Sequence, residues 1–486
     1  MVTENQSASL EAATLEHASA ISQPRRVGQF ERGRPFVFAA FGVCVLLWVA
    51  IYNGYPTVFS DTGGYLLTGA FFIPYTPFRA PGYSVFARVT SHSVSPWFTI
   101  VAQAVIVVYV LRETCNYLVC GKRKLRDYCL LAAICVLAAL TSLPWVVSQL
   151  MPDVFAGVLF LSAFLLAFAA ELRVIQKVVL AVIFTISVSA HTSLFPIAVL
   201  LVVALAALKF FGRQPHDFST VRPVLAWLLA PIIAGGILTA SLNSKMGLGF
   251  KVTPSRNIFL LARLFGDGLA QDYLRANCPQ RPYISCRYLS NLPRNQDSFL
   301  FYSPLLKDLT GHDDELADIV RGTLAAYPIK FVAISARNSA VQLAILRTGD
   351  EVRANHGRYH DDAAIPQVFP QDFQSFKNAR QYRGDLVPLV RYVVAPLDMA
   401  IFWVSVAGCI WFARTRRFAR INQFFYAAVA LLVINASVCA TLAGIFDRYQ
   451  SRVAWIIPFC LTAYVCCWAK ESASQSENTC GSRLQP

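Results

Sequence analysis

The chain has 486 residues, of which 56% are hydrophobic and only 15% are charged, and its formal net charge is +15. A soluble domain cannot bury so much apolar surface, so the composition excludes an ordinary soluble protein and indicates a polytopic membrane protein. The excess of Lys and Arg would also suit a nucleic-acid-binding protein, but no RNA- or DNA-binding motif is present. Membrane topology accounts for the charge, so we expect no nucleic-acid partner.

The chain begins with a polar, alanine-rich stretch. Residues 1–30 contain no apolar core of the kind that a cleavable signal peptide needs, so the first apolar run is expected to act as a signal anchor. Residues 1–30 and the tail, residues 471–486, are predicted to be disordered, because they are too polar to build a core.

Apolar runs dominate the rest of the chain. A hydrocarbon core about 30 Å thick requires roughly 17–25 apolar residues in a helix. We therefore expect an all-α polytopic membrane protein with about ten transmembrane helices, the first seven in an N-terminal module (31–243) and the last three in a C-terminal module (393–470). The candidate spans are 36–54, 97–111, 128–147, 154–170, 174–190, 194–211, 223–242, 393–412, 423–443 and 453–469.

The basic residues predict the orientation of these spans. With the N-terminus in the cytoplasm, every cytoplasmic segment between spans is basic, as the positive-inside rule requires. The short outer loops then carry few basic residues, namely Arg79, Arg88, Arg448 and Arg452. The expected location is a bacterial inner membrane, with both termini in the cytoplasm.

One long hydrophilic segment, residues 244–392, falls on the outside between the seventh and eighth spans. It holds most of the acidic residues and an amphipathic stretch near Leu316–Leu346, so it is predicted to be a partly helical external domain. Cys278 and Cys286 lie in it, eight positions apart. They can form a disulfide in an oxidising periplasm or remain unrelated thiols; their spacing is not zinc-like, and no pair of histidines is near.

Unusual polar residues gather at the predicted outer ends of the spans. Asp61 follows the first span, Asp153 opens the fourth, His191 lies between the fifth and sixth, and Arg448 and Arg452 precede the tenth. Ionisable groups at membrane depth are costly, so they tend to be paired or functional. Each also has a simpler interpretation: a helix N-cap for the two aspartates, a turn residue for the histidine, and snorkelling side chains for the arginines.

The loop after the first span, residues 55–96, is longer than a connector requires. A short apolar stretch begins at Gly63, three prolines break it into turns, and Pro81–Arg88 has the pattern of a second, amphipathic helix. We expect two short helices that lie along the membrane surface, as interfacial helices do.

At these residues the sequence resembles the GT-C superfamily of integral-membrane glycosyltransferases, which includes dolichyl-phosphate-mannose protein mannosyltransferases, aminoarabinose transferases and rhizobial lipopolysaccharide transferases. The resemblance rests on Asp61, on the Arg-x-Pro-x-Tyr pattern of Arg79, Pro81 and Tyr83, and on Asp153. Two departures are present: Asp61 has no second acidic residue beside it, and the second acidic site reads Pro-Asp rather than acidic-Pro. No Asp-x-Asp pair therefore suggests a metal, and no cofactor is expected, although a divalent metal is not excluded.

The resemblance implies a sugar donor linked to a polyprenyl phosphate and an acceptor hydroxyl on a lipid, a glycan or a protein. Asp61 is the expected catalytic carboxylate, which takes or orients the acceptor proton. The departing lipid phosphate needs fixed positive partners, for which we expect Arg448 and Arg452. The other expected substrate-binding residues are Asp153 and His191 on hydroxyl groups, Arg79 as an alternative phosphate ligand, and Tyr65 and Tyr83 stacked on the sugar.

The expected function is therefore a membrane glycosyltransferase acting at the outer face of the inner membrane. A polysaccharide polymerase or ligase is the alternative, and it would depend on Arg and His rather than on Asp61. A transporter is disfavoured because the spans carry almost no charge at mid-membrane and show no inverted repeat. A membrane acyltransferase would need a deep, cytoplasm-accessible histidine, whereas His191 lies at an outer end.

Overall fold

The computed structural model describes residues 29–74, 79–210, 218–350, 352 and 361–481. Residues 1–28, which the sequence predicted to be disordered, lie outside this part, as do the last five residues of the tail. The chain divides into a first unit, Met1–Phe41, and a second, Gly42–Pro486. Helix α2 begins in the first unit, and the residues of the candidate site all lie in the second.

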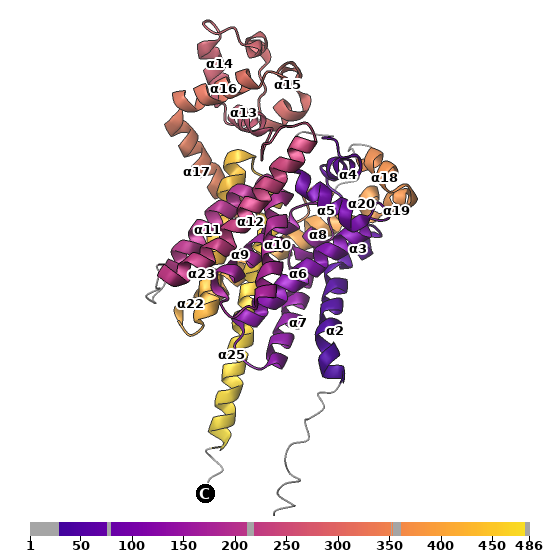
Figure 1. Ribbon diagram of the computed structural model, residues 1–486, viewed down its shortest axis with the longest axis vertical. Coiled ribbons are helices and arrows are strands. Elements are labelled where there is room, and N and C mark those ends of the chain that lie inside the picture. Colours follow the sequence, from indigo (N-terminus) through magenta and orange to yellow (C-terminus); the bar gives the residue numbers. More distant parts are fainter. Residues whose placement is uncertain (1–28, 75–78, 211–217, 351, 353–360, 482–486) are drawn as a thin grey trace, which may run out of the picture. The chain divides into compact units, whose positions relative to one another are not determined.

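The described residues form helices and no strand, which confirms the all-α class (Figure 1). The helices are α2 (Gln29–Leu46), α3 (Trp48–Asn53), α4 (Thr62–Phe71), α5 (Pro81–Ser91), α6 (Trp97–Leu118), α7 (Arg123–Leu140), α8 (Leu143–Val147), α9 (Val154–Phe168), α10 (Val174–Ala190), α11 (Leu194–Phe210), α12 (Phe218–Lys245), α13 (Arg256–Gly266), α14 (Leu269–Asn277), η1 (Ile284–Asn291), η2 (Ser298–Tyr302), α15 (Pro304–Asp308), α16 (Asp313–Ala326), α17 (Pro328–Ala344), α18 (Asp361–Val368), η3 (Pro370–Asp372), α19 (Phe373–Asn378), α20 (Arg380–Arg383), α21 (Leu386–Leu389), η4 (Val390–Val394), α22 (Ala395–Arg414), α23 (Ala419–Leu442), α24 (Asp447–Ala454) and α25 (Ile456–Gly481).

Five helical segments of the described chain are long and apolar enough to cross a membrane, or six if one bent pair counts as a span. The five are Trp97–Leu118, Arg222–Lys245, Leu386–Arg414, Ala419–Leu442 and Asp447–Ala473. Four more predicted spans are shorter apolar helices: Phe36–Leu46, Val154–Phe168, Val174–Ala190 and Leu194–Phe210. A multi-pass membrane protein is thus supported, and the count of ten stays a prediction.

Two predicted spans are interrupted where the backbone leaves the helix. The segment 128–147 splits because Thr141 is extended and ends α7, and α8 starts afresh at Leu143 with a proline in its first turn. The segment 36–54 divides at Leu47, which lies between α2 and α3. A hydropathy window cannot detect either break, because the residues on both sides are equally apolar.

Helix α9 lies at the centre of the bundle. Its residues from Val154 to Ala167 are all buried, and it packs against α6, α10, α11, α12 and α23. The predicted short helices α4 and α5 are present and pack against each other and, through α5, against α10. A Cβ atom on Gly82 of α5 would lie 2.2 Å from the carbonyl oxygen of Ser189, so this close approach requires glycine.

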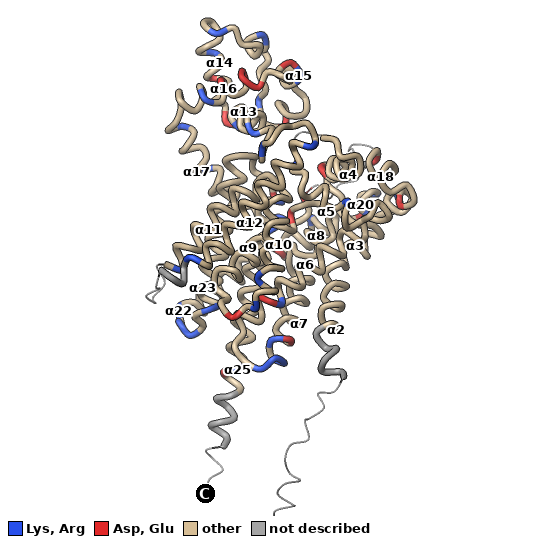
Figure 2. The backbone as a smooth tube through the Cα atoms, in the orientation of Figure 1, with Lys and Arg blue, Asp and Glu red and all other residues tan. Residues whose placement is uncertain are grey.

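Basic turns meet at one end of the bundle. Figure 2 shows Lys and Arg at the turn between α6 and α7 and at the turn between α22 and α23. Arg420 joins the two turns, because its guanidinium donates to the carbonyl oxygen of Tyr117 at 3.0 Å and to Glu171 at 3.1 Å. Glu171 follows the C-terminal end of α9, whereas Asp153 precedes its N-terminal end. The residues singled out by the sequence therefore lie at the opposite end from the basic turns.

Residues 244–392, the predicted external domain, pack in two ways. Helices α13, α14 and α16 share a hydrophobic core that includes Leu264, Phe265 and Ile319. The amphipathic stretch 316–346, however, bends by 93° between α16 and α17, where Pro328 starts a new helix, and α17 then packs along α23. Helix α18 packs against α4. The segment thus returns to the bundle, beside the loop that follows the first apolar run.

The tail is also more ordered than expected. Helix α25 continues to Gly481, although residues from 471 onward were predicted to be disordered. Extending an existing helix avoids the cost of nucleation, and residues 471–480 contain neither proline nor glycine to stop it.

Candidate active site

A short parallel bridge positions the loop that carries Asp61. The amide of Thr57 donates to the carbonyl oxygen of Ser148 at 3.0 Å, and the amide of Leu150 donates to the carbonyl oxygen of Thr57 at 2.9 Å. The hydroxyl of Thr62 donates to the carbonyl oxygen of Leu150 at 3.1 Å. These bonds tie the segment before α4 to the segment before α9, so that Asp61 and Asp153 come to the same end of the bundle.

Residues near the end of the 244–392 segment hold the same loop from the other side. The side-chain amide of Gln381 accepts from the amide of Val58 at 2.9 Å and donates to its carbonyl oxygen at 2.7 Å. The backbone amide of Gln381 donates to Oδ1 of Asn53 at 2.7 Å. Buried polar groups that are fully paired in this way fix a backbone segment in place.

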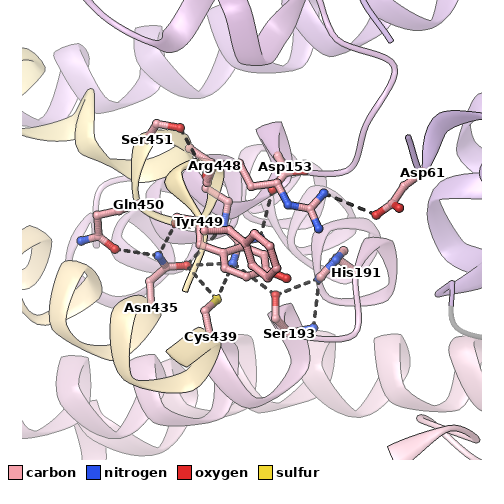
Figure 3. A network of polar contacts seen from close by, with 12 residues as sticks. Asp61, Asp153, His191, Ser193, Asn435, Cys439, Arg448, Tyr449, Gln450 and Ser451 are labelled. Atoms are coloured by element: carbon pink, nitrogen blue, oxygen red, sulfur yellow. Dashed lines mark hydrogen bonds and ion pairs between the residues drawn. The ribbon is translucent and has the colours of Figure 1, made fainter. Parts of the chain in front are cut away.

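Asp61 is held by two arginines. Its carboxylate accepts from the guanidinium of Arg79 and, at 3.4 Å, from that of Arg448, and its side chain is only 10% exposed. Asp61 stands at the N-cap position of α4 but makes no capping hydrogen bond to that helix. The simple capping interpretation is therefore wrong, because Oδ1 is paired with Arg79 and Oδ2 with Arg448. Figure 3 shows the contact with Arg448.

Asp153 is paired with Arg452. The distance between the guanidinium of Arg452 and Oδ1 of Asp153 is 3.2 Å, and the arginine side chain is 0% exposed. The same guanidinium donates to Oδ1 of Asn435 at 2.8 Å and to the Ser193 hydroxyl at 3.2 Å. Asp153 likewise makes no side-chain capping bond to α9.

The burial of Arg452 changes its expected role. We expected it to bind a lipid phosphate, but its guanidinium is enclosed by Asp153, Asn435 and Ser193 and joins α9, α23 and α24. Asn435 also donates to Gln450 at 3.0 Å, which fastens α24 to α23. Arg452 thus has a structural role, because it holds three helices together. Of the two predicted phosphate ligands, Arg448 has the more accessible side chain.

His191 lies beside this network. Its Nδ1 accepts from the amide of Ser193 at 3.1 Å and lies 2.8 Å from the Ser193 hydroxyl. Burial, together with the positive charges of Arg452 and Arg448, lowers the pKa of His191 well below its ordinary value of 6.5. The histidine is therefore neutral near pH 7 and, with Nδ1 accepting, carries its proton on Nε2.

Tyr65 and Tyr83 are buried, which corrects the expectation that they stack on a sugar. They are 1% and 0% exposed, and their rings pack edge to face at 5.2 Å. The Tyr83 hydroxyl donates to Gln103 at 2.8 Å. Both rings support the packing of α4 and α5 and have no face open to a substrate.

A cavity lies next to the paired residues. It encloses about 410 Å³ of space free of atoms, part of it open to solvent. Asp153 and Arg448 line the cavity. Asp61 does not line it but forms an ion pair with Arg448. The other lining residues come from four different segments: Thr57, Trp145, Val146, Gln149, Thr348, Gly349, Asp350, Val352 and Ser451.

The sequence reasoning missed several of these residues. Asn435 carried a usable signal, because it is an amide inside a predicted span. Thr348 and Asp350 carried none, since they lie in a long hydrophilic segment and reach the cavity only through the return of α17 to the bundle.

Arginines outnumber aspartates among the ion-paired groups of the site. Arg79, Arg448 and Arg452 face Asp61 and Asp153, which leaves one positive charge in excess among these largely buried groups; Asp350 in the cavity lining carries a negative charge but is not paired with any of them. A buried excess charge favours a counter-ion. The arrangement can therefore hold an anion near Arg79 and Arg448, where one guanidinium nitrogen of each, Nε, is buried without a hydrogen-bond partner in the described structure.

Cys278 and Cys286 are joined in a disulfide. They lie outside the cavity, next to the core shared by α13, α14 and α16. Within the described part of the chain, no three or more His, Cys, Asp or Glu side chains gather as a group that could hold a metal ion.

Comparisons of this chain with protein-family models, with curated proteins and with solved structures find no match.

Proposed function

We propose that the protein is a membrane glycosyltransferase that moves a sugar from a polyprenyl phosphate to an acceptor hydroxyl. The observation that carries this proposal is a carboxylate, Asp61, held between Arg79 and Arg448, the second of which lines the cavity. A glycosyl phosphate needs positive groups for its phosphate and a carboxylate for the attacking hydroxyl, and this arrangement has both.

The ion pairs of Asp61 suggest how the site would respond to a donor. An arriving phosphate competes with Asp61 for the guanidinium groups of Arg79 and Arg448, because both anions accept the same N–H donors. Each arginine that turns to the phosphate frees an oxygen of Asp61. Donor binding would thus produce the free carboxylate that the reaction requires.

The chemical step is a single displacement. The acceptor oxygen attacks the anomeric carbon while its proton passes to Asp61. The bond between that carbon and the phosphate oxygen breaks, and the polyprenyl phosphate leaves with the electron pair, stabilised by Arg448 and Arg79. One displacement inverts the anomeric configuration. His191 can donate from Nε2 to a substrate hydroxyl.

The placement of the site supports an extracytoplasmic reaction. The site lies at the end of α9 opposite to the basic turns, and basic turns are cytoplasmic in most membrane proteins. We therefore place the cavity at the outer face of a bacterial inner membrane. The prenyl chain would lie between helices that face lipid, and the acceptor would be a lipid, a glycan or a protein.

Replacement of Asp61 by Asn tests the proposal in cells. We expect the surface-glycan profile, measured by mass spectrometry at matched protein abundance, to lose a component. Asp272→Asn is the matched control, because Asp272 is half exposed, on α14 and outside the cavity. A normal profile with Asp61→Asn would rule out the catalytic assignment. Loss of the component on replacing Arg448 or His191, but not Asp61, would favour a polymerase or ligase.

A further inference from the structure

One wall of the cavity comes from the segment that follows α17. Thr348, Gly349 and Asp350 come from the turn that follows α17. Gly349 has φ +87°, and a Cβ atom there would lie 2.1 Å from a methyl group of Val390. Only glycine fits this turn, so the placement of its two neighbours at the cavity is fixed by the backbone.

An apolar cluster supports the same wall. Val352, Trp145 and Val390 pack together with Val49 and Leu386, and Trp145 and Val352 also line the cavity. Packing contacts therefore hold the turn on both sides of Asp350 and fix the backbone position of this residue.

Four polar residues of the lining, Asp153, Thr348, Asp350 and Ser451, offer a ligand only hydrogen-bond acceptors, whereas Thr57, Gln149 and Arg448 in the same lining also carry donors. The hydroxyl of Thr348 donates to the carboxylate of Asp398, and the hydroxyl of Ser451 donates to the carbonyl oxygen of Arg448 at 3.3 Å. Both hydroxyl oxygens can therefore only accept a hydrogen bond from a ligand. Oδ2 of Asp153 is buried and has no partner in the described structure. Asp350 forms no ion pair with any described residue. A ligand that satisfies these groups must supply several hydrogen-bond donors.

The charges add a second restriction. Asp153 is neutralised by Arg452, whereas Asp350 leaves one negative charge on this wall. A second carboxylate brought into the cavity would meet Asp350 as a like charge. From these observations, and resting on the function proposed above, we propose that the transferred sugar carries several free hydroxyl or amino groups and no carboxylate, and that Asp350 is the residue that rejects acidic sugars.

The test uses the purified full-length chain in lipid nanodiscs and three synthetic probes: farnesyl phosphate, its glucosyl ester and its glucuronosyl ester. We expect wild type to bind the glucosyl compound about tenfold more tightly than the glucuronosyl compound, the effect of roughly 1.4 kcal/mol. Asp350→Asn should bring the two affinities together, while Asp272→Asn preserves the difference. Farnesyl phosphate, which lacks a sugar, should bind wild type and Asp350→Asn alike.

The outcomes separate this inference from the function beneath it. If the two sugar compounds bind wild type equally, or the acidic one binds more tightly, the selectivity is refuted although phosphate binding stands. If wild type discriminates but Asp350→Asn discriminates equally, with farnesyl phosphate still bound, Asp350 is not the selective residue. If wild type does not bind farnesyl phosphate at all, the proposed function fails, and the inference fails with it.

Discussion

The buried pair of Arg452 and Asp153 gives a sharp prediction for stability. Arg452→Met removes a guanidinium that is 0% exposed and leaves the Asp153 side chain, 4% exposed, without its counter-charge. Breaking a buried pair by removing one partner costs about 3–5 kcal/mol, since an uncompensated charge remains in a medium of low polarity. Asn435 and Ser193 lose a donor as well, so we expect the upper half of that range.

The measurement is a titration with SDS in mixed micelles, which gives the apparent free energy of unfolding. Arg383→Met is the matched control, because the ion pair of Arg383 with Asp385 is about half exposed and should contribute less than about 1 kcal/mol. Adding Asp153→Asn to Arg452→Met removes the stranded charge and should restore a substantial part of the loss. If Arg452→Met costs no more than the control, or the second change restores nothing, the structural role of Arg452 is refuted.

Two further predictions concern the surroundings of the site. Gly82→Ala places a methyl group against the backbone of Ser189, so we expect a loss of about 1–3 kcal/mol as a lower midpoint of thermal unfolding; an unchanged midpoint would contradict the close packing of α5 on α10. His191 has a folded-state pKa below its ordinary 6.5, so its contribution to stability is fully present above that pH and falls as the pH drops, by at most about 1.4 kcal/mol per unit. His191→Gln should flatten this dependence between pH 7 and 5, and an equally steep profile in the variant would contradict a buried, neutral histidine.

The convergence of Asp61, Asp153, His191 and Arg448 was predictable from the apolar runs and from the basic segments between them. Each of these residues lies at the end of an apolar run, so the order of runs decides which ends meet. The helices α4 and α5 were predictable for a similar reason, because prolines mark their limits.

The remaining features depend on contacts that no local pattern encodes. Arg448 and Arg452 are four positions apart and look alike in sequence, yet one lines the cavity and the other is enclosed by α9 and α23. Asp350 meets the cavity only because α17 bends at Pro328 and returns along α23. The burial of Tyr65 and Tyr83 depends on how α4 and α5 pack, which periodicity alone does not specify.

The competition between Asp61 and a phosphate for the same arginines is the central claim. The measurement is the affinity of farnesyl phosphate for the chain in nanodiscs, compared among wild type, Asp61→Asn and Arg448→Gln. Asp61→Asn should bind equally or more tightly, because the competing carboxylate charge is gone, while Arg448→Gln should bind at least about tenfold more weakly through loss of a charge-assisted hydrogen bond. Weaker binding by Asp61→Asn, or unchanged binding by Arg448→Gln, would contradict the account.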